Sequence, residues 1–341
     1  MKAIRLHETG GPEVLHLDEV DLPKPGLGEV LIKAHSIGVG LPDQLIRTGR
    51  YPWMPELPTI PGIEMSGTVA AIGTNVTKFK EGESVVVSAV PKRGCYAEYM
   101  VADINWVFPC SKTINPSYAA CLINYRVAWN ILHTAARVRA GDTVVIVGAA
   151  GGVGNALLQL AKVSELVVIA LTRSPRKVKY LMDQGADHVI DTSSNELSKQ
   201  IRMITNGRGV DFFIDPVGGI SFVNHLDLLA PMGMLIMYGL MEGFPPDGVF
   251  RAQCKNWARS PAVRMFSIHS YDDQPEVTEN NVELLLKMIE DTRIKPTIFA
   301  EFPLNMASQA HRLLDTGDVI GKIILQPGRK KPLYTNISMP L

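Results

Sequence analysis

The amino-acid sequence predicts an α/β protein of two domains, an antiparallel and partly barrel-like domain and a doubly wound parallel sheet. The first third of the chain is rich in glycine and proline, and its apolar runs are short, which is typical of strands joined by turns. From about residue 117 onward, apolar runs of strand length alternate with segments of helical spacing, which is typical of a doubly wound sheet. The length of 341 residues also fits two domains of about 150 residues each.

Strands are predicted in the first region where apolar and β-branched residues cluster between turn signals. These runs lie at residues 30–34, 67–72 and 83–87. Prolines recur between positions 23 and 61, and they exclude long helices there. The region is therefore expected to be antiparallel and mostly strand.

The second region alternates strands with helices. Ser117 is expected to cap a helix, after which apolar residues recur at helical spacing as far as Leu132. The almost wholly apolar run at 143–147 is typical of a parallel strand that is covered on both faces. Further strands are predicted at 166–171, 188–190, 210–214, 234–237, 263–267 and 321–325, helices at 155–163, 175–184 and 277–289, and a tail at 329–341.

Charge and cysteine content exclude several classes of protein. The chain has 34 lysines and arginines and 34 aspartates and glutamates, so it has no long-range field for a nucleic acid or an anionic membrane. Its four cysteines include no CxxC pair, which argues against a zinc ribbon or a disulfide framework. No apolar run approaches the ~20 residues needed to cross a bilayer, and residues 1–8 contain no apolar signal core. We therefore expect a cytoplasmic protein that binds neither nucleic acid nor membranes.

A glycine-rich loop gives the sharpest functional signal. It follows the apolar strand at 143–147 and precedes an amphipathic helix, and it holds Gly151 and Gly154 at the second and third places of a dinucleotide fingerprint. Ala149 stands where the first fingerprint glycine is usual. Glycines let the backbone approach a pyrophosphate, whose charge is stabilised by the N-terminus of the helix. The loop predicts a cofactor site that includes Ala150, Gly151, Gly152, Val153 and Gly154.

The end of the next strand indicates which nucleotide binds. NAD sites place an acidic residue there to accept a hydrogen bond from the ribose. This chain has Thr172 followed by Arg173, Arg176 and Lys177, with no acid among residues 171–177. Arg173 and Lys177 could pair with a 2′-phosphate, or they could be solvated residues of the first helical turn. We expect NADP(H), with Thr172, Arg173 and Lys177 at the cofactor.

The chain resembles the medium-chain dehydrogenase/reductase superfamily, and within it the zinc-free NADPH:quinone oxidoreductase group. The motifs that carry the resemblance are spread over almost the whole chain, at residues 57–67, 71–73, 96–99, 148–154, 215–218 and 321–325. The resemblance implies a GroES-like catalytic domain of residues 1–124 and 273–341, and a Rossmann domain of residues 125–272. It also implies that Val217 and Gly239 contact the cofactor.

The zinc ligands of related dehydrogenases are missing from this sequence. Gly40 stands where these relatives have a cysteine, and Ile63 replaces their histidine. Around the third ligand the chain has residues 122–124, which include no thiol, and the four-cysteine structural lobe is absent. A catalytic zinc needs three protein ligands and a structural zinc needs four. We therefore predict that the protein holds no metal.

The resemblance implies a substrate segment that ends in the Gly-x-Tyr-Pro motif of quinone reductases. Tyr51 matches a tyrosine that lines the site in quinone reductases and donates a proton in related enoyl reductases. Three usual residues are replaced, since Gly40 stands for an asparagine, Leu45 for a tyrosine and Val127 for a threonine. We predict a substrate pocket that contains Asp43, Leu45, Tyr51, Asn124 and Phe266, with Tyr51 as the catalytic residue or only as a wall.

The expected activity is hydride transfer from NADPH to a quinone or another α,β-unsaturated carbonyl, in a cleft between the domains. Such an acceptor spreads the arriving charge over a conjugated system, so it does not depend on a Lewis acid as an alkoxide does. One alternative is an enoyl thioester (CoA or ACP) reductase, in which Arg47, Arg50 and Arg251 would form a basic entrance. Another is a non-catalytic, crystallin-like NADPH-binding protein. The resemblance also implies a homodimer that pairs through residues 263–267, which would cover an apolar edge strand.

Overall fold

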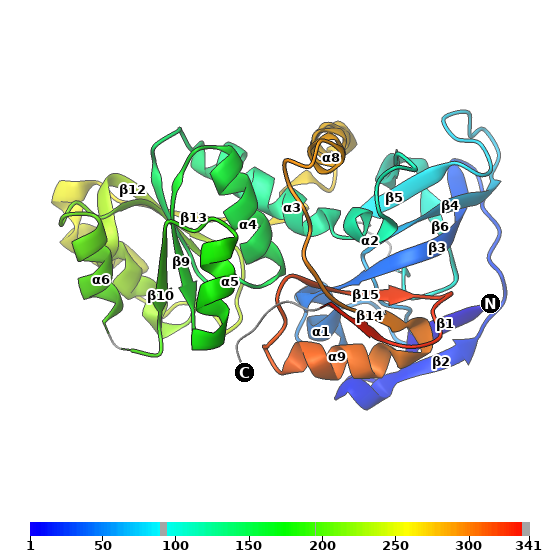
Figure 1. The fold of residues 1–341 in the computed structure, drawn as a ribbon. Coiled ribbons are helices and arrows are strands. Elements are labelled where there is room, and N and C mark those ends of the chain that lie inside the picture. The colour runs from blue at the N-terminus through cyan, green and yellow to red at the C-terminus, as the bar shows by residue number, and fades with distance from the viewer. Residues whose placement is uncertain (89–93, 195, 336–341) are drawn as a thin grey trace. The chain divides into compact units, whose positions relative to one another are not determined.

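The computed structural model describes residues 1–88, 94–194 and 196–335, which form two compact units (Figure 1). The antiparallel unit consists of residues 1–126 and 271–335, and the parallel unit consists of residues 127–270. The helix α3, Leu122–Trp129, spans the position at which the chain passes from the first unit to the second. Each unit has its own core and is described by itself.

Antiparallel pairing dominates the sheets of the antiparallel unit. The described residues form a two-stranded sheet of β1 (Lys2–Leu6) and β2 (Leu15–Glu19), and a larger sheet in which β16, β14, β15, β3, β4, β5 and β7 are neighbours in that order, while β6 also pairs with β3. The strands of the larger sheet are β3 (Glu29–Val39), β4 (Glu64–Ile72), β5 (Ser84–Ser88), β6 (Tyr99–Asp103), β7 (Val107–Pro109), β14 (Ile298–Pro303), β15 (Lys322–Gln326) and β16 (Leu333–Tyr334). Only β14 and β15 run parallel to each other in this sheet. The predicted antiparallel, GroES-like domain is therefore confirmed.

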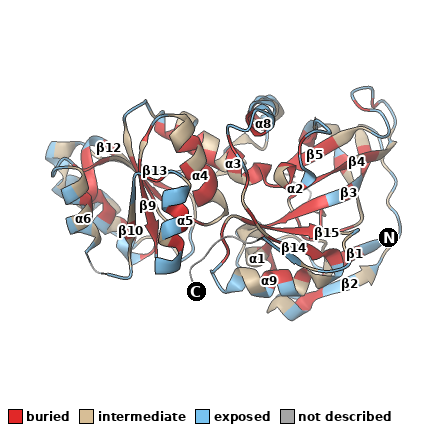
Figure 2. Cartoon of the chain, in the orientation of Figure 1, coloured by how far each residue is buried: buried red, intermediate tan, exposed pale blue. Residues whose placement is uncertain are grey.

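The strands curve around an apolar core because one face of each carries the apolar residues. In β3, Val30, Ile32 and Ile37 are fully buried, while Lys33 and His35 face outward. Figure 2 shows buried residues along the strands of this unit. The helices α1 (Leu41–Arg47), α2 (Pro116–Ala119), α8 (Pro275–Glu290) and α9 (Ala307–Asp315) complete it.

Two sequence expectations in this unit are wrong. The N-cap of α2 is Asn115 and not Ser117, because the Asn115 side chain accepts a hydrogen bond from the Ser117 N–H at 2.8 Å, and Pro116 occupies the first helical turn. The predicted tail forms β16, in which Leu333 pairs with Glu301 of β14. A two-residue strand is too short to show periodicity, and the edge of β14 specifies it. Residues 336–341 lie outside the described part of the chain.

The parallel unit contains a doubly wound sheet, as predicted. The described strands are β8 (Thr143–Ile146), β9 (Val167–Thr172), β10 (His188–Asp191), β11 (Val210–Asp215), β12 (Leu229–Met237) and β13 (Ala262–Met265). They lie in the order β10-β9-β8-β11-β12-β13, and every neighbouring pair is parallel. The sheet order reverses between β8 and β11, which is the switch point where open α/β sheets bind ligands.

Helices cover both faces of this sheet. The helices α4 (Gly152–Val163) and α5 (Val178–Asp183) lie on one side, and α6 (Leu197–Ile204) lies on the other, with α7 (Val249–Lys255) before β13 (Figure 1). Val144, Val145 and Ile146 of β8 are fully buried, as expected for a strand covered on both faces. The predicted helix at 175–184 begins as a 3₁₀ turn, Pro175–Lys177, because a proline opens it.

Candidate active site

The glycine loop lies directly at the switch point. Gly148 has a φ of +64°, so the chain turns there in a conformation that favours glycine. A Cβ atom on Gly154 would lie 2.2 Å from the carbonyl oxygen of Gly148, so only glycine fits at this close approach. The turn glycine is therefore Gly148, one residue before the fingerprint position held by Ala149. Sequence analysis missed it because the fingerprint spacing alone was considered.

The N-terminus of α4 is open toward this loop. Gly151 is the N-cap in extended conformation, and no side chain caps the helix. The first N–H groups of a helix have no partner within it, and together with the helix dipole they favour an anion. Ala150, Gly151, Gly152 and Val153 offer no long side chain that would block the approach. The loop therefore fits a pyrophosphate.

Residues after three other strands lie at the same edge of the sheet. Thr172 ends β9, Val217 follows β11, and Gly239 follows β12. Because all strands are parallel, their carboxyl ends meet along one edge. A Cβ atom on Gly239 would lie 2.5 Å from the carbonyl oxygen of Pro216, so the loops after β11 and β12 approach closely. The structure thus brings the predicted cofactor residues together along one edge.

A buried aspartate holds the loop after β11. Asp215 accepts hydrogen bonds from the N–H groups of Val217 at 2.6 Å and Gly218 at 3.2 Å. Its other oxygen lies 3.1 Å from Nδ1 of His225, and the His225 ring stacks on Phe213 with centroids 4.1 Å apart. Asp215 is fully buried, and its partners satisfy the carboxylate. This pair sets the position of Val217, and sequence spacing gave no sign of it.

The two cations predicted for the 2′-phosphate differ in exposure. The Arg173 side chain is 82% exposed and lies 3.7 Å from Oε1 of Glu242, while Lys177 is buried. Thr172 accepts a hydrogen bond from the Ser174 N–H at 3.1 Å, which fixes the turn that carries Arg173. Arg173 is therefore open to a ligand. Glu242 is a competing partner that sequence analysis did not consider.

The predicted substrate residue Phe266 belongs to this unit. It follows β13, and its N–H donates to the carbonyl oxygen of Met237 at 2.8 Å. Its side chain is half-buried at the carboxyl edge that also carries the cofactor loops.

In the antiparallel unit, the predicted pocket residue Asp43 lies in the first turn of α1. Its carboxylate accepts hydrogen bonds from the N–H groups of Gly40 at 2.9 Å and Gly62 at 3.1 Å. Burial raises the pKa of the Asp43 carboxyl to about 6, and its exposed fraction is 1%. The Asp43 carboxylate thus links the start of α1 to the loop that precedes β4.

Tyr51 and Leu45 lie close together on that segment. The Tyr51 N–H donates to the carbonyl oxygen of Leu45 at 3.2 Å, and the half-buried Tyr51 side chain packs against the core of the unit. The Tyr51 ring meets the ring of Trp53 edge to face, with centroids 5.7 Å apart. Trp53 is 54% exposed, so the aromatic pair reaches the surface of its unit.

An ion pair occupies the region where related dehydrogenases hold zinc. Nζ of Lys322 lies 2.5 Å from Oε1 of Glu64, and both side chains are buried. The second Glu64 oxygen accepts a hydrogen bond from the Ile123 N–H at 3.0 Å. A Cβ atom on Gly40 would lie 3.2 Å from Nζ of Lys322, so a cysteine at this position would crowd the ammonium.

The donor set around this ion pair does not suit zinc. Among the residues that the structure describes, no group of three His, Cys, Asp or Glu side chains could hold a metal ion. Asn124 is half-buried. Its backbone N–H donates to the carbonyl oxygen of Cys121 at 3.2 Å, whereas its side-chain amide has no hydrogen-bond partner in the described part of the chain. The Cys121 thiol donates to the carbonyl oxygen of Ser117 at 3.2 Å, and burial raises the pKa of this thiol.

Two buried arginines, Arg126 and Arg47, hold segments of the antiparallel unit together. Arg126 is buried and donates to Oγ1 of Thr278 in α8 at 2.7 Å. Arg47 is 2% exposed and donates to both carboxylate oxygens of Asp315 at 2.8 Å. Because Arg47 is buried and paired, the expectation that it lines a basic entrance is wrong.

A parallel sheet with a glycine loop at its switch point, in one chain with an antiparallel unit, defines the class of nucleotide-dependent dehydrogenases. Two family models match the chain: the alcohol dehydrogenase GroES-like domain at residues 26–112, and the zinc-binding dehydrogenase domain at residues 152–283.

Individual relatives extend the match to most of the chain. A quinone oxidoreductase of Rattus norvegicus is 32% identical over 331 residues, which cover 95% of this chain and 97% of the relative. The synaptic vesicle membrane protein VAT-1 homolog of the same species is 32% identical over 326 residues, which cover 91% and 79%.

Solved structures agree with these relatives. A quinone oxidoreductase of Escherichia coli complexed with NADPH has a TM-score of 0.89 at 26% identity, and the match covers 96% of this chain and 100% of that chain. A mycobacterial protein complexed with NADPH has a TM-score of 0.88 at 33% identity, with the same coverage. The chain belongs to the medium-chain dehydrogenase/reductase superfamily, in its quinone oxidoreductase group, and is an oxidoreductase. None of the helices in the described ranges has the length and apolar character to span a bilayer.

Proposed function

We propose that this protein uses NADPH to reduce quinones or other α,β-unsaturated carbonyls, and that it does so without zinc. The observation that carries the proposal is the glycine loop at the switch point, followed one strand later by the open Arg173 where NAD-binding sites have an acid. The similarity to quinone oxidoreductases, and the NADPH in two of the similar structures, support it.

The residues of the parallel unit would hold the cofactor. The N-terminus of α4 would accept the pyrophosphate, and the guanidinium of Arg173 would pair with the 2′-phosphate. Val217 and Gly239 would line the nicotinamide half, on loops that Asp215 and the close approach to Pro216 hold in place. Bound NADPH supplies the hydride.

A conjugated acceptor suits the residues of the antiparallel unit. Gly40, Ile63 and Asn124 provide no zinc ligands at the positions where related enzymes bind the metal. Hydride addition to a quinone or enone places negative charge on a conjugated oxygen, which a hydrogen-bond donor can stabilise. The hydroxyl of Tyr51 would be this donor, and Leu45 and Trp53 of the same unit would provide apolar contacts to the substrate.

A turnover screen tests the proposal. Quinones, enones and enoyl thioesters are offered in turn with NADPH and with NADH, and nucleotide oxidation is followed by absorbance. Turnover of quinones or enones that prefers NADPH supports the proposal. Turnover restricted to enoyl thioesters would favour the thioester reductase, and stoichiometric NADPH binding without turnover of any acceptor would favour a non-catalytic protein.

A further inference from the structure

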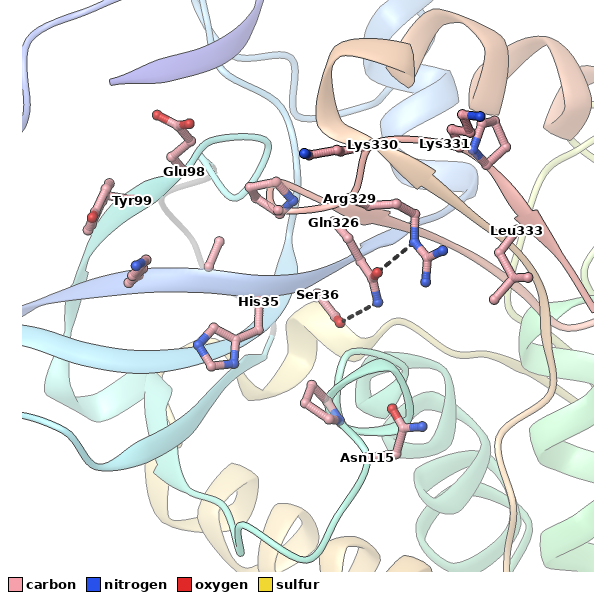
Figure 3. A pocket seen from close by; sticks show the side chains of 16 residues that line it. His35, Ser36, Glu98, Tyr99, Asn115, Gln326, Arg329, Lys330, Lys331 and Leu333 are labelled. Atoms are coloured by element: carbon pink, nitrogen blue, oxygen red, sulfur yellow. Dashed lines mark hydrogen bonds between the residues drawn. The ribbon is translucent and has the colours of Figure 1, made fainter.

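The antiparallel unit contains a second pocket that shares no residue with the predicted active site. It has a volume of about 1010 Å³ and lies between the outward face of β3, the start of α2 and the segment that follows β15 (Figure 3). Ligand sites for small molecules commonly span about 300–1,000 Å³. The pocket is therefore large enough for a metabolite.

The floor of this pocket is polar and held by hydrogen bonds. Nε2 of Gln326 donates to Oγ of Ser117 at 3.1 Å and to Oγ of Ser36 at 3.4 Å. Ser117 in turn donates to Glu301 at 2.6 Å, and Nε of Arg329 donates to Oε1 of Gln326 at 2.7 Å. Because both serines are buried and the donors are satisfied, the floor is a rigid polar surface.

Positive charge is concentrated around this floor. Lys33, Arg329, Lys330 and Lys331 line the pocket, whereas Glu98 is the only acidic residue in the lining. The whole chain has a formal net charge of +0, so the excess is local. Figure 3 shows Lys330 extending toward the side of the pocket where Glu98 and Tyr99 lie.

Two carboxylates, Glu98 in the lining and Glu301 beside it, offset this excess only in part. Glu98 accepts a hydrogen bond from the Lys2 N–H at 2.7 Å, and Arg329 is paired with Glu301 beside the floor. Within the described ranges of the chain, Lys33, Lys330 and Lys331 form no ion pair with a carboxylate. Cations gathered in a concave surface repel one another and raise the local concentration of anions.

We propose that this pocket binds a small phosphate-bearing metabolite. Lysine ammonium groups bind phosphate as point charges, and here Lys33, Lys330 and Lys331 line the pocket, while the fourth cation, Arg329, is held by Glu301 and Gln326. The aromatic rings of His35 in β3 and Tyr99 in β6 also line the pocket, and the organic part of the metabolite would lie against them. The site is separate from the cofactor loop, because all of its lining residues belong to the antiparallel unit.

Calorimetric titration with inorganic tripolyphosphate tests this proposal. The protein is first saturated with NADP⁺, so that the probe cannot be counted at a nucleotide site. We expect binding that weakens as salt rises, and a loss of affinity of about tenfold or more in the double variant Lys330→Gln/Lys331→Gln, because each charge-assisted contact contributes at least that much in favourable cases. The matched control is Lys24→Gln/Lys112→Gln, which removes two exposed lysines of the same unit that lie outside the pocket and should change affinity less than twofold.

Three results would overturn the proposal. The first is no binding of tripolyphosphate to the NADP⁺-saturated protein, and the second is equal affinity in the double variant and its parent. The third is tight binding of a single-stranded oligonucleotide through these lysines while tripolyphosphate fails to bind, which would indicate an extended surface instead of a small-ligand site. Unchanged thermal unfolding of both double variants ensures that a loss of binding is not a loss of fold.

Discussion

The guanidinium of Arg173 lies 3.7 Å from the carboxylate of Glu242, and both side chains are more than half exposed. An ion pair this exposed contributes little, about 0–1 kcal/mol, so a phosphate can replace the carboxylate as the partner of Arg173. Glu242, on the loop after β12, is therefore expected to influence how strongly Arg173 binds the 2′-phosphate of the cofactor.

Arg173→Ala is expected to raise the Michaelis constant for NADPH about ten- to hundredfold, because a charge-assisted contact with phosphate contributes roughly 1.5–3 kcal/mol. The constant for NADH should change little, since NADH has no 2′-phosphate. Steady-state kinetics with both nucleotides checks this. Equal efficiency with NADPH and NADH in the unmodified protein would refute the assignment of the cofactor.

Glu242→Gln provides the complementary prediction. Removing the competing carboxylate should lower the Michaelis constant for NADPH by no more than a few fold, because the exposed pair is weak. Its effect on NADH should be smaller. An increase in the NADPH constant would mean that Glu242 orients Arg173 and does not compete for it.

Gly154→Ala should weaken cofactor binding more than an alanine substitution at any other glycine of the loop. The added Cβ would lie 2.2 Å from the carbonyl oxygen of Gly148, and overpacking of this kind costs about 1–3 kcal/mol. Thermal unfolding with and without NADPH measures both the loss of stability and the loss of the cofactor-induced shift. Gly328→Ala is the control, because no atom lies within 4 Å of a Cβ at that position.

Strands such as β3, β8 and β9 could be predicted because their apolar runs are local features of the sequence, whereas β1, β2, β6 and β14 lie outside the predicted runs. The run from Thr143 to Ile146 is one example, and the pattern of glycines in the following loop is another. Features that join distant segments could not be predicted in this way. The ion pair of Lys322 with Glu64 and the ladder of Leu333 with Glu301 depend on tertiary contacts that no local pattern encodes.

Side-chain burial was the other gap. Arg47 and Lys177 carry the positive charge expected of residues that bind an anionic ligand. Both are buried in the structure, and Arg47 is paired with Asp315. A sequence states the charge of a residue and not its exposure. Whether a charged side chain is free to meet a ligand therefore depends on tertiary packing, which a local sequence pattern does not encode.

We expect the purified protein to contain no stoichiometric zinc and to need no metal for turnover. Elemental analysis of protein purified without added metal should find well under one zinc per chain, because the ammonium of Lys322 lies near Gly40 and the described residues include no group of three side chains that could hold a metal ion. Chelators should leave turnover unchanged. Stoichiometric zinc would contradict this prediction and would show that the chain holds a zinc ligand set away from Gly40.

A homodimer is expected to form along β13. In the described part of the chain this strand is at the edge of the parallel sheet and pairs with β12 alone, and Met265 on it is 58% exposed. Light scattering at micromolar concentration should report a dimer, and Met265→Lys should shift it toward monomer. The control Met203→Lys replaces a methionine on α6 that is 69% exposed and should leave the mass unchanged.

Tyr51→Phe tests whether the segment after α1 takes part in chemistry. The change keeps the ring and its edge-to-face contact with Trp53 and removes only the hydroxyl, so folding and NADPH affinity should hardly change. After hydride addition to an enone, a proton must reach the α-carbon or the oxygen, and a general acid contributes about 10²–10⁴-fold to such a step. Enone turnover should therefore fall by about this factor, whereas quinone turnover should fall less, because a hydroquinone anion is stable and can take its proton from water. Tyr334→Phe, at an exposed tyrosine of β16, is the matched control and should have the parental rate. Enone turnover at the parental rate in Tyr51→Phe would mean that Tyr51 is only a wall of the pocket.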